Sequence, residues 1–300
     1  MEHKPSITIG IPAFNEEANI GHLIHDILTQ DMSGYILEKI VIASDGSTDN
    51  TISILNAIQA PQLEVLDNKD RKGQSARQNQ IIERTTSDIL VLLNADILIK
   101  DKHFIYKLIQ PVYQGKADLS SSALEILPGR NFIEKTLRVG FEAKTMVFEQ
   151  VQGAQNIYTC HGAARAFSKK LYQNFRFKNS VGEDAYSYLY TVYNGYRYGY
   201  VKDAIAYIRY ADNLEDHKKQ SLRFAQSKKQ FTSEFGDEFV RKQYDIPLQA
   251  YVVPGMHFML KNPIAILAYG LFFLKSSFEK IFSHTISDTW SISTSSKSLR

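Results

Sequence analysis

The sequence predicts an α/β fold built on a mostly parallel sheet with flanking helices. Over the first hundred residues, short β-branched and aliphatic runs alternate with helical patterns. These runs carry few polar residues, as is typical of parallel strands covered on both faces. Polar stretches follow the strands, at the end of the sheet where such folds bind ligands. The four strands expected here are residues 6–11, 39–43, 63–66 and 88–93.

Helices are predicted between these strands. Ile20, Leu23 and Ile24 recur at helical spacing and give residues 16–28 one apolar face. Turn residues precede the next helix, in which Ser47 or Thr48 is placed to act as the N-cap. A third, more polar helix is expected over residues 75–85.

The alternation fades after Asp118, and the second half predicts mixed structure. The elements expected there are a strand at 120–126, helices at 132–152 and 181–193, a strand at 200–207 and a basic helical region at 212–244. Pro247, Pro254 and Pro263 then punctuate a different region, which contains the apolar run 264–274. We therefore expect one α/β domain at 1–244, an apolar helical appendage at 245–285 and a disordered tail at 286–300.

Composition excludes several classes of protein. The chain has 300 residues, 44% hydrophobic and 22% charged, with a net charge of +3, which gives no reason to expect a nucleic-acid partner. The single cysteine, Cys160, cannot form an intramolecular disulfide, which fits a reducing compartment. No P-loop, dinucleotide fingerprint, zinc-protease motif or serine-hydrolase elbow is present.

Carboxylates stand where the strands end. Asp45 ends the second strand, Asp96 follows the fourth, and Glu183 and Asp184 begin a later helix. Such acids can hold a divalent cation, which in turn can hold a diphosphate. A carboxylate can also accept a hydrogen bond from a nucleobase or a ribose.

Six short motifs carry a resemblance to a known family. They are Pro12-Ala13-Phe14-Asn15-Glu16-Glu17, Ser44-Asp45-Gly46-Ser47-Thr48-Asp49, Lys72-Gly73 with Ala76-Arg77-Gln78-Asn79, Asn94-Ala95-Asp96, Glu183-Asp184 and Gln220-Ser221-Leu222-Arg223-Phe224. In order and spacing they resemble the family 2 inverting glycosyltransferases. The resemblance implies the GT-A fold, a Rossmann-like, mostly parallel sheet with flanking helices, to which the helical C-terminal appendage is added.

The resemblance also implies a donor site for a UDP-sugar. Ala13 and Phe14 would flank the uracil, Glu16 would accept from the ribose, and Asp45 would accept from uracil N3–H. Lys72 and Arg77 would lie near the diphosphate. The full set of implied nucleotide-sugar residues is Pro12, Ala13, Phe14, Glu16, Asp45, Lys72, Arg77, Asn94 and Ala95.

The family pattern further implies metal-dependent chemistry. Asp96 would bind Mn²⁺ or Mg²⁺, and Asp184, beside Glu183, would be the general base that deprotonates the acceptor hydroxyl. The residues implied for the acceptor or the diphosphate are Gln220, Arg223, Phe224 and His161. Asn94 stands where the family has the first acid of D-x-D, and Phe224 where it has tryptophan.

Each assignment has a purely structural alternative. Asp45 suits a turn, Asp184 suits the first turn of a helix, and Arg223 lies in a basic, solvated stretch. Cys160 is expected to be a small buried residue. The seven tyrosines between Tyr186 and Tyr200 are expected mainly to bury their rings, with a sugar-binding groove as the alternative.

The C-terminal apolar run suggests contact with a membrane surface. Its 11 residues fall short of the roughly 20 needed to span a bilayer. Lys261 and Lys275 flank it, a pattern typical of an interfacial helix, and we expect contact through residues 256–283. The alternatives are a helical cap on the sheet or an oligomer contact.

The sequence therefore predicts a metal-dependent inverting glycosyltransferase. It would move a sugar from a nucleotide-sugar to a hydroxyl acceptor, such as a glycan or a lipid-linked sugar. Since no signal peptide is evident, we expect a cytoplasmic enzyme, peripheral on the inner face of the membrane. The alternatives are a degenerate binding or scaffold module of the same fold and a nucleotidyltransferase. The motifs leave the sugar, the acceptor and the oligomeric state open.

Overall fold

The computed structural model describes residues 4–178, 182–210, 213–282 and 299. It divides the chain into two compact units. The first contains residues 1–125, 160–208 and 297–300, and the second contains residues 126–159 and 209–296. The domain boundaries that we predicted at 244/245 and 285/286 do not coincide with the limits of these units, and they stay predictions. The predicted tail lies outside the described residues except for Leu299.

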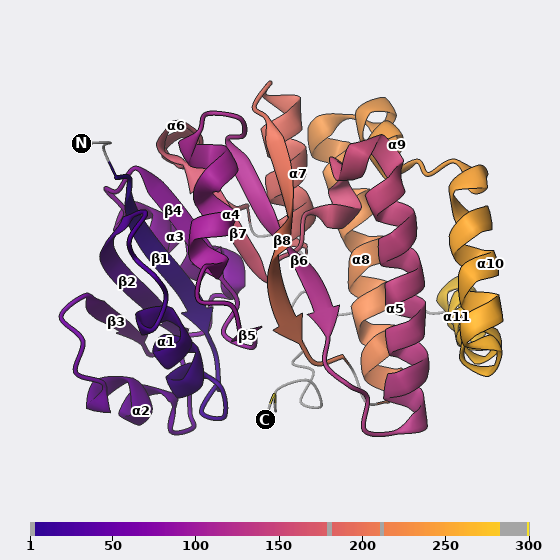
Figure 1. Ribbon diagram of the computed structural model, residues 1–300, viewed down its shortest axis with the longest axis horizontal. Coiled ribbons are helices and arrows are strands. Elements are labelled where there is room, and N and C mark those ends of the chain that lie inside the picture. Colours follow the sequence, from indigo (N-terminus) through magenta and orange to yellow (C-terminus); the bar gives the residue numbers. More distant parts are fainter. Residues whose placement is uncertain (1–3, 179–181, 211–212, 283–298, 300) are drawn as a thin grey trace. The chain divides into compact units, whose positions relative to one another are not determined.

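One sheet organises the first unit (Figure 1). In the described residues it has eight strands in the order β3-β2-β1-β4-β7-β6-β8-β5. Strands β1, β2, β3 and β4 pair in parallel, whereas β7 is antiparallel to β4 and β6, and β5 is antiparallel to β8. Their bounds are β1 Ser6–Ala13, β2 Ile36–Asp45, β3 Leu63–Asn68, β4 Ile89–Leu93, β5 Leu98–Ile99, β6 Leu119–Ile126, β7 Ala164–Ser168 and β8 Tyr198–Ile208.

Successive side chains of a strand point to opposite faces of the sheet, and here both faces are apolar, so helices cover both. The helices are α1 Ile20–Leu28, α2 Thr51–Ala57, α3 Gln74–Glu83, α4 Phe104–Tyr113, α6 Lys169–Asn174 and α7 Glu183–Tyr193. Ile9 and Val91 face the core that α1 and α4 complete. Gly10, the residue after Ile9, faces α3 on the opposite side of the sheet, where an added Cβ atom would lie 2.2 Å from Cγ2 of Ile81. Glycine at this position therefore lets α3 pack close to β1.

Most predicted elements of this unit are present, with shifted ends. The expected helix 16–28 begins only at Ile20, because Glu16 accepts the backbone N–H groups of Asn19 and Ile20 in a turn. The strands β5 and β7 and the helices α4 and α6 were not predicted. The helix expected from residue 181 begins at Glu183, while residue 181 lies outside the described residues.

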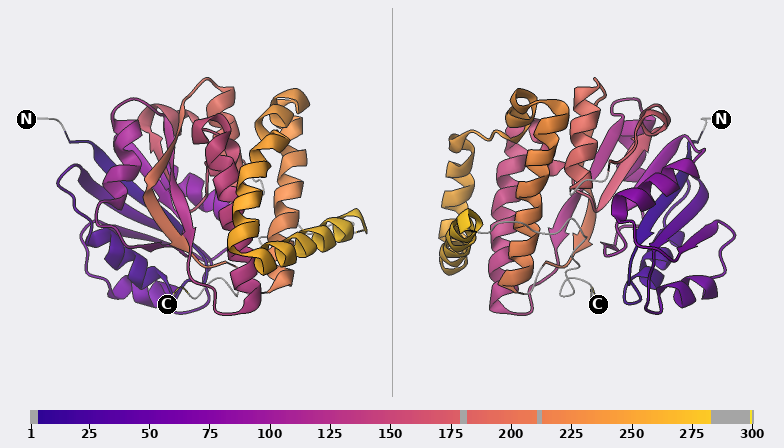
Figure 2. Two further views of the ribbon diagram at one scale, coloured as in Figure 1. Left: turned by 45° about the vertical axis from the view of Figure 1, so that its right-hand side comes forward. Right: turned by 180° about the vertical axis from the view of Figure 1, so that it is seen from behind.

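The second unit is helical. Its described residues form α5 Phe132–Gln150, α8 Leu214–Phe235, α9 Asp237–Tyr244, α10 Val252–Lys261 and α11 Pro263–Phe282, with three short 3₁₀ turns at Val151–Ala154, Ile157–Thr159 and Leu248–Tyr251. The single basic helical region expected over 212–244 is interrupted at Gly236, whose φ of +87° separates α8 from α9. Figure 2 shows α11 turning away from the end of α10.

Candidate active site

Two loops at the carboxyl ends of β1 and β2 are joined side by side. Strand pairing sets Ala13 opposite Ser44 and so brings the loops together. The backbone N–H of Asn15 donates to Ser47 Oγ at 3.1 Å, and Asn15 Oδ1 accepts from the Thr48 N–H at 2.8 Å. The backbone N–H of Glu16 donates to Thr51 Oγ1 at 2.7 Å. The first two motifs therefore form one continuous surface.

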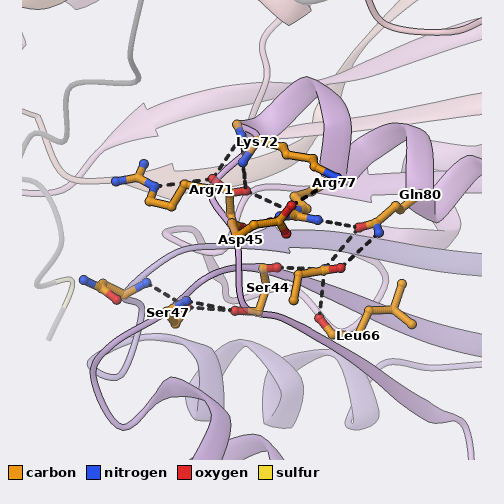
Figure 3. Close-up of polar contacts among 12 residues, drawn as sticks. Ser44, Asp45, Ser47, Leu66, Arg71, Lys72, Arg77 and Gln80 are labelled. Carbon is orange, nitrogen blue, oxygen red and sulfur yellow. Dashed lines mark hydrogen bonds and ion pairs between the residues drawn. The ribbon is translucent and has the colours of Figure 1, made fainter.

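Asp45 is the centre of a buried network at the end of β2 (Figure 3). Its Oδ1 accepts the backbone N–H of Lys72 at 2.8 Å, that of Gly73 at 3.1 Å and Nε–H of Arg77 at 2.8 Å. Its Oδ2 accepts from the Gly73 N–H at 3.1 Å and lies 3.6 Å from Arg71 Nε. Asp45 is fully buried, so these donors replace water around its charge.

Arg77, which the resemblance implies to lie near a diphosphate, belongs to this buried network. The structure buries it almost completely in α3, where its guanidinium also pairs with Asp70 at 2.9 Å and donates to Gln80 at 3.1 Å. The hydrogen bonds from Arg77 and Lys72 lower the pKa of Asp70 to about 2. Arg77 therefore holds Asp45 and the 70–73 loop in place. Lys72 is largely exposed, and its Nζ lies 3.0 Å from Asp70 Oδ2.

The Asn94-Ala95-Asp96 motif follows β4 and meets two other motifs. The Asn94 side chain accepts from Nε2 of Gln74, the first residue of α3, at 3.1 Å. A Cβ atom on Gly162 would lie 3.2 Å from Glu183 Oε1, 3.7 Å from Asn94 Nδ2 and 3.7 Å from Asp184 Cβ. Asn94, Glu183 and Asp184 thus converge on Gly162, although about ninety residues separate them in sequence.

Glu183 and Asp184 lie in the first turn of α7, which begins after Gly182 with a φ of +94°. A buried arginine of β7, Arg165, holds this turn through two hydrogen bonds. Its Nη1 donates to the Glu183 carbonyl at 2.9 Å and to Ser187 Oγ at 2.8 Å. Nε and Nη2 of Arg165 have no hydrogen-bond partner. Burial also lowers the pKa of nearby His161 to about 4, so its imidazole is neutral at pH 7.

The remaining predicted residues fall in three groups. Pro12, Ala13, Phe14 and Glu16 are buried around the end of β1, and Ala95 is buried after β4. The side chains of Gln220, Arg223 and Phe224, on α8 of the second unit, lie outside what the structure describes. Cys160 is buried, as are Tyr186 and Tyr188, in agreement with the structural alternative for these residues.

Sequence reasoning missed several residues of this region. Arg71, Gln74, Gly162 and Arg165 belong to no motif that we used, and each becomes visible only through its contacts. The position of Gln74, next to the Lys72-Gly73 motif and at the start of a helix, is the one signal that could have indicated it.

The oxygen atoms of Asn94 and Asp96 suit a divalent cation that binds together with a diphosphate. In the described residues, no group of three or more His, Cys, Asp and Glu side chains could hold a metal ion. Asp96 and Asn94 offer one carboxylate and one amide two residues apart. Mg²⁺ is commonly held by one or two carboxylates together with substrate phosphates. The residues therefore fit a divalent cation whose remaining ligands come from a diphosphate and water.

Comparison with known proteins relates the chain to glycosyltransferases. A 4,4'-diaponeurosporenoate glycosyltransferase of Staphylococcus aureus is 34% identical over 124 residues, which are 40% of this chain and 32% of the relative. The match thus spans about a third of the length of that protein. Residues 8–176 match the sequence model of glycosyl transferase family 2.

Solved structures show the same fold. A mannosyltransferase from Pyrobaculum calidifontis in complex with GDP-Man and Mn²⁺ has a TM-score of 0.60 at 16% identity, covering 95% of this chain and 77% of that one. Glucosyl-3-phosphoglycerate synthase from Mycobacterium tuberculosis, with Mn²⁺, UDP and phosphoglyceric acid, has a TM-score of 0.58 at 19% identity, covering 77% and 79%. The predicted GT-A fold is confirmed, and the chain belongs to glycosyl transferase family 2.

Proposed function

We propose that this chain transfers a sugar from a UDP-sugar to a hydroxyl acceptor with inversion at the anomeric carbon. One observation carries the proposal: Asp45, the 72–74 segment, Asn94 and the Glu183–Asp184 turn lie next to one another. Hydrogen bonds join Asp45 to Lys72 and Gln74 to Asn94, and Asn94 and the Glu183–Asp184 turn both border Gly162. A nucleotide-sugar needs such a series of groups, with a nucleobase site at one end and a catalytic carboxylate at the other. Family membership supports the same activity.

The base end is formed by Phe14 and Asp45. Phe14 supplies an aromatic face, and Asp45 Oδ2 accepts a hydrogen bond from the Gly73 N–H and has a lone pair for a second donor. Uracil N3 carries a proton that can be donated to this oxygen, whereas cytosine N3 carries none. This difference supports uridine over cytidine as the nucleoside.

The diphosphate would lie between the two ends. Asp96 and Asn94 would hold the divalent cation, which when bound offsets the negative charge of the departing UDP. Lys72, with its exposed ammonium group, can add a further positive charge. Mn²⁺ or Mg²⁺ accompanies UDP in the related solved structures, which supports the same cofactor here.

Asp184 would act as the general base. It stands in the first turn of α7 beside Gly162, where an added Cβ atom would lie 3.7 Å from Asp184 Cβ. The carboxylate would take the acceptor hydroxyl proton as the oxygen attacks the anomeric carbon, and UDP would leave from the opposite face. Glu183 and His161 flank this position, and His161 can offer a neutral nitrogen to the acceptor.

Nucleotide titration tests the donor proposal. We expect UDP with Mn²⁺ to raise the melting temperature of the protein, because a ligand that binds only the folded state stabilises it. CDP should give a smaller shift, since it cannot donate to Asp45, and removing Mn²⁺ with a chelator should reduce the effect of UDP. If no nucleotide changes the melting temperature, the proposal is wrong. If UDP binds but no UDP-sugar is turned over, the degenerate binding module is supported instead.

We further propose that the acceptor is presented at a membrane surface, to which the second unit binds. No helix in the described part of the chain is long and apolar enough to cross a bilayer. Large apolar side chains are nevertheless exposed in succession along α10 and α11, including Leu260 at 85% and Ile264 at 73%. Lys261 lies exposed between them and suits anionic lipid.

Liposome sedimentation tests this contact. The wild-type protein should sediment with vesicles that contain anionic lipid. The double variant Leu260→Asp/Leu267→Asp should stay in the supernatant, because charged groups oppose insertion of the apolar face. Ile36→Asp, at an equally apolar exposed position of the first unit, should sediment like the wild type. If the wild-type protein does not sediment with vesicles, the proposal fails.

A further inference from the structure

Arg71 lies over the two residues that form the proposed base site. Its guanidinium carbon is 3.7 Å from the centre of the Phe14 ring, and its Nε is 3.6 Å from Asp45 Oδ2. Figure 3 shows Arg71 directed toward Asp45. The side-chain stem runs past Gly46, where a Cβ atom would lie 3.4 Å from Arg71 Cγ. A planar cation thus covers an aromatic ring and approaches a buried carboxylate.

The contacts of Arg71 with Phe14 and Asp45 are the same two that the proposed function assigns to uracil. A guanidinium and a uracil ring are both flat, and both can stack on Phe14. Both also carry an N–H group that can face Asp45 Oδ2. We infer that Arg71 occupies the place of the base in the nucleotide-free protein and exchanges with it on binding. This inference rests on the proposed function, since it needs a base site at Phe14 and Asp45.

Burial supports a covering role for Arg71. Phe14 is 6% exposed and Asp45 is fully buried, whereas the Arg71 side chain is 42% exposed. Arg71 therefore has solvent on one side and can leave by rotation of its own side chain. Asp45 keeps its bonds to Arg77 and to the Lys72 and Gly73 backbone when this happens. The exchange thus needs no change in the rest of the network.

The exchange has a measurable consequence for affinity. When the binding-competent state is only partly populated, the apparent dissociation constant rises by the inverse of that fraction. Removing the Arg71 side chain should therefore tighten nucleoside binding. A partly exposed ion pair and one cation–π contact are each weak, so we expect a gain of about three- to tenfold.

Uridine is the probe for this test, because it has no phosphates that a displaced arginine could contact. Ligand-observed NMR titration should show Arg71→Ala binding uridine about three- to tenfold more tightly than the wild type. Lys69→Ala, an exposed residue two positions earlier, should bind uridine within about twofold of the wild type. Added salt should tighten uridine binding to the wild type by screening the Arg71–Asp45 pair, and should not affect Arg71→Ala.

The outcomes separate this inference from the function on which it rests. If UDP stabilises the wild type but Arg71→Ala binds uridine equally or more weakly, Arg71 does not compete with the base and only this inference fails. If neither protein binds UDP or uridine, the proposed function fails together with it. The melting temperature of Arg71→Ala establishes in each case that the variant is folded.

Discussion

At the scale of single residues, the buried pair Asp45–Arg77 is the main structural requirement of the site. Asp45 was predictable, because it follows an apolar strand within a known motif. Its partner was not predicted as such: the arginine of a polar helix suggests a solvent-facing or ligand-facing cation. The structure instead buries the guanidinium, with its Nε 2.8 Å from the carboxylate. Which charge faces inward depends on packing between α3 and β2, and a motif does not contain this information.

Replacing Arg77 should therefore destabilise the fold. Arg77→Met leaves Asp45 buried without its charged partner, and we expect the free energy of unfolding to fall by about 3–5 kcal/mol in urea titrations. Arg84→Met, at an exposed pair with Glu64, should cost less than about 1 kcal/mol. The double variant Asp45→Asn/Arg77→Met should recover part of the loss. Equal effects of Arg77→Met and Arg84→Met would contradict this account.

His161 should make stability depend on pH. The unfolded chain takes up a proton near pH 6.5, whereas burial delays protonation of the folded protein until about pH 4. Between these values the unfolded state binds more protons, so the contribution of His161 is full above pH 6.5 and is lost as the pH falls toward 4. The slope is at most about 1.4 kcal/mol per pH unit.

Urea unfolding at several pH values between 4 and 7 measures this effect. His161→Gln should reduce the slope of stability against pH in this window, and His25→Gln, on the exposed side of α1, should retain it. An unchanged slope in His161→Gln would show that this imidazole is not the group responsible.

At the scale of elements, the parallel half of the sheet was predictable and the antiparallel half was not. β1, β2, β3 and β4 are apolar runs separated by helices, a pattern that local sequence contains. β7 lies between β4 and β6 but carries Arg165 at its second position, and a charged residue argues against a buried strand. Its place in the sheet follows from pairing with distant residues, such as Leu92 with Arg165.

Arg165 connects β7 to α7, and its replacement should separate UDP binding from turnover. Met fits among the neighbouring Phe167 and Phe177 rings and removes two buried nitrogen atoms, Nε and Nη2, that have no hydrogen-bond partner. Arg165→Met also removes the two hydrogen bonds that Nη1 donates, so the free energy of unfolding should fall by about 1–3 kcal/mol. Because the first turn of α7 loses its support from β7, turnover of a UDP-sugar should fall at least tenfold with UDP affinity unchanged. Loss of UDP affinity in parallel would contradict a role confined to this turn.

At the scale of the whole molecule, the two units divide the proposed tasks. The first unit brings together the base end, Asn94 and the Glu183–Asp184 turn, and the second exposes the apolar face of α10 and α11. The order of the motifs in the sequence predicted the first arrangement, since strand ends of one parallel sheet share an edge. It did not predict that residues 126–159 leave the α/β unit and pack with the C-terminal helices, because this depends on long-range contacts.

The measurement that tests the central claim most directly is release of UDP from a panel of UDP-sugars, with water as the acceptor. With Mn²⁺ present, we expect the wild type to release UDP from at least one of them and Asp184→Asn to be at least a hundredfold slower, because the general base is lost. Asp184→Asn should bind UDP within about twofold of the wild type, and Asp67→Asn, at the exposed pair with Lys69, should keep the wild-type rate. Wild-type turnover by Asp184→Asn, or no turnover by the wild type, would contradict the account.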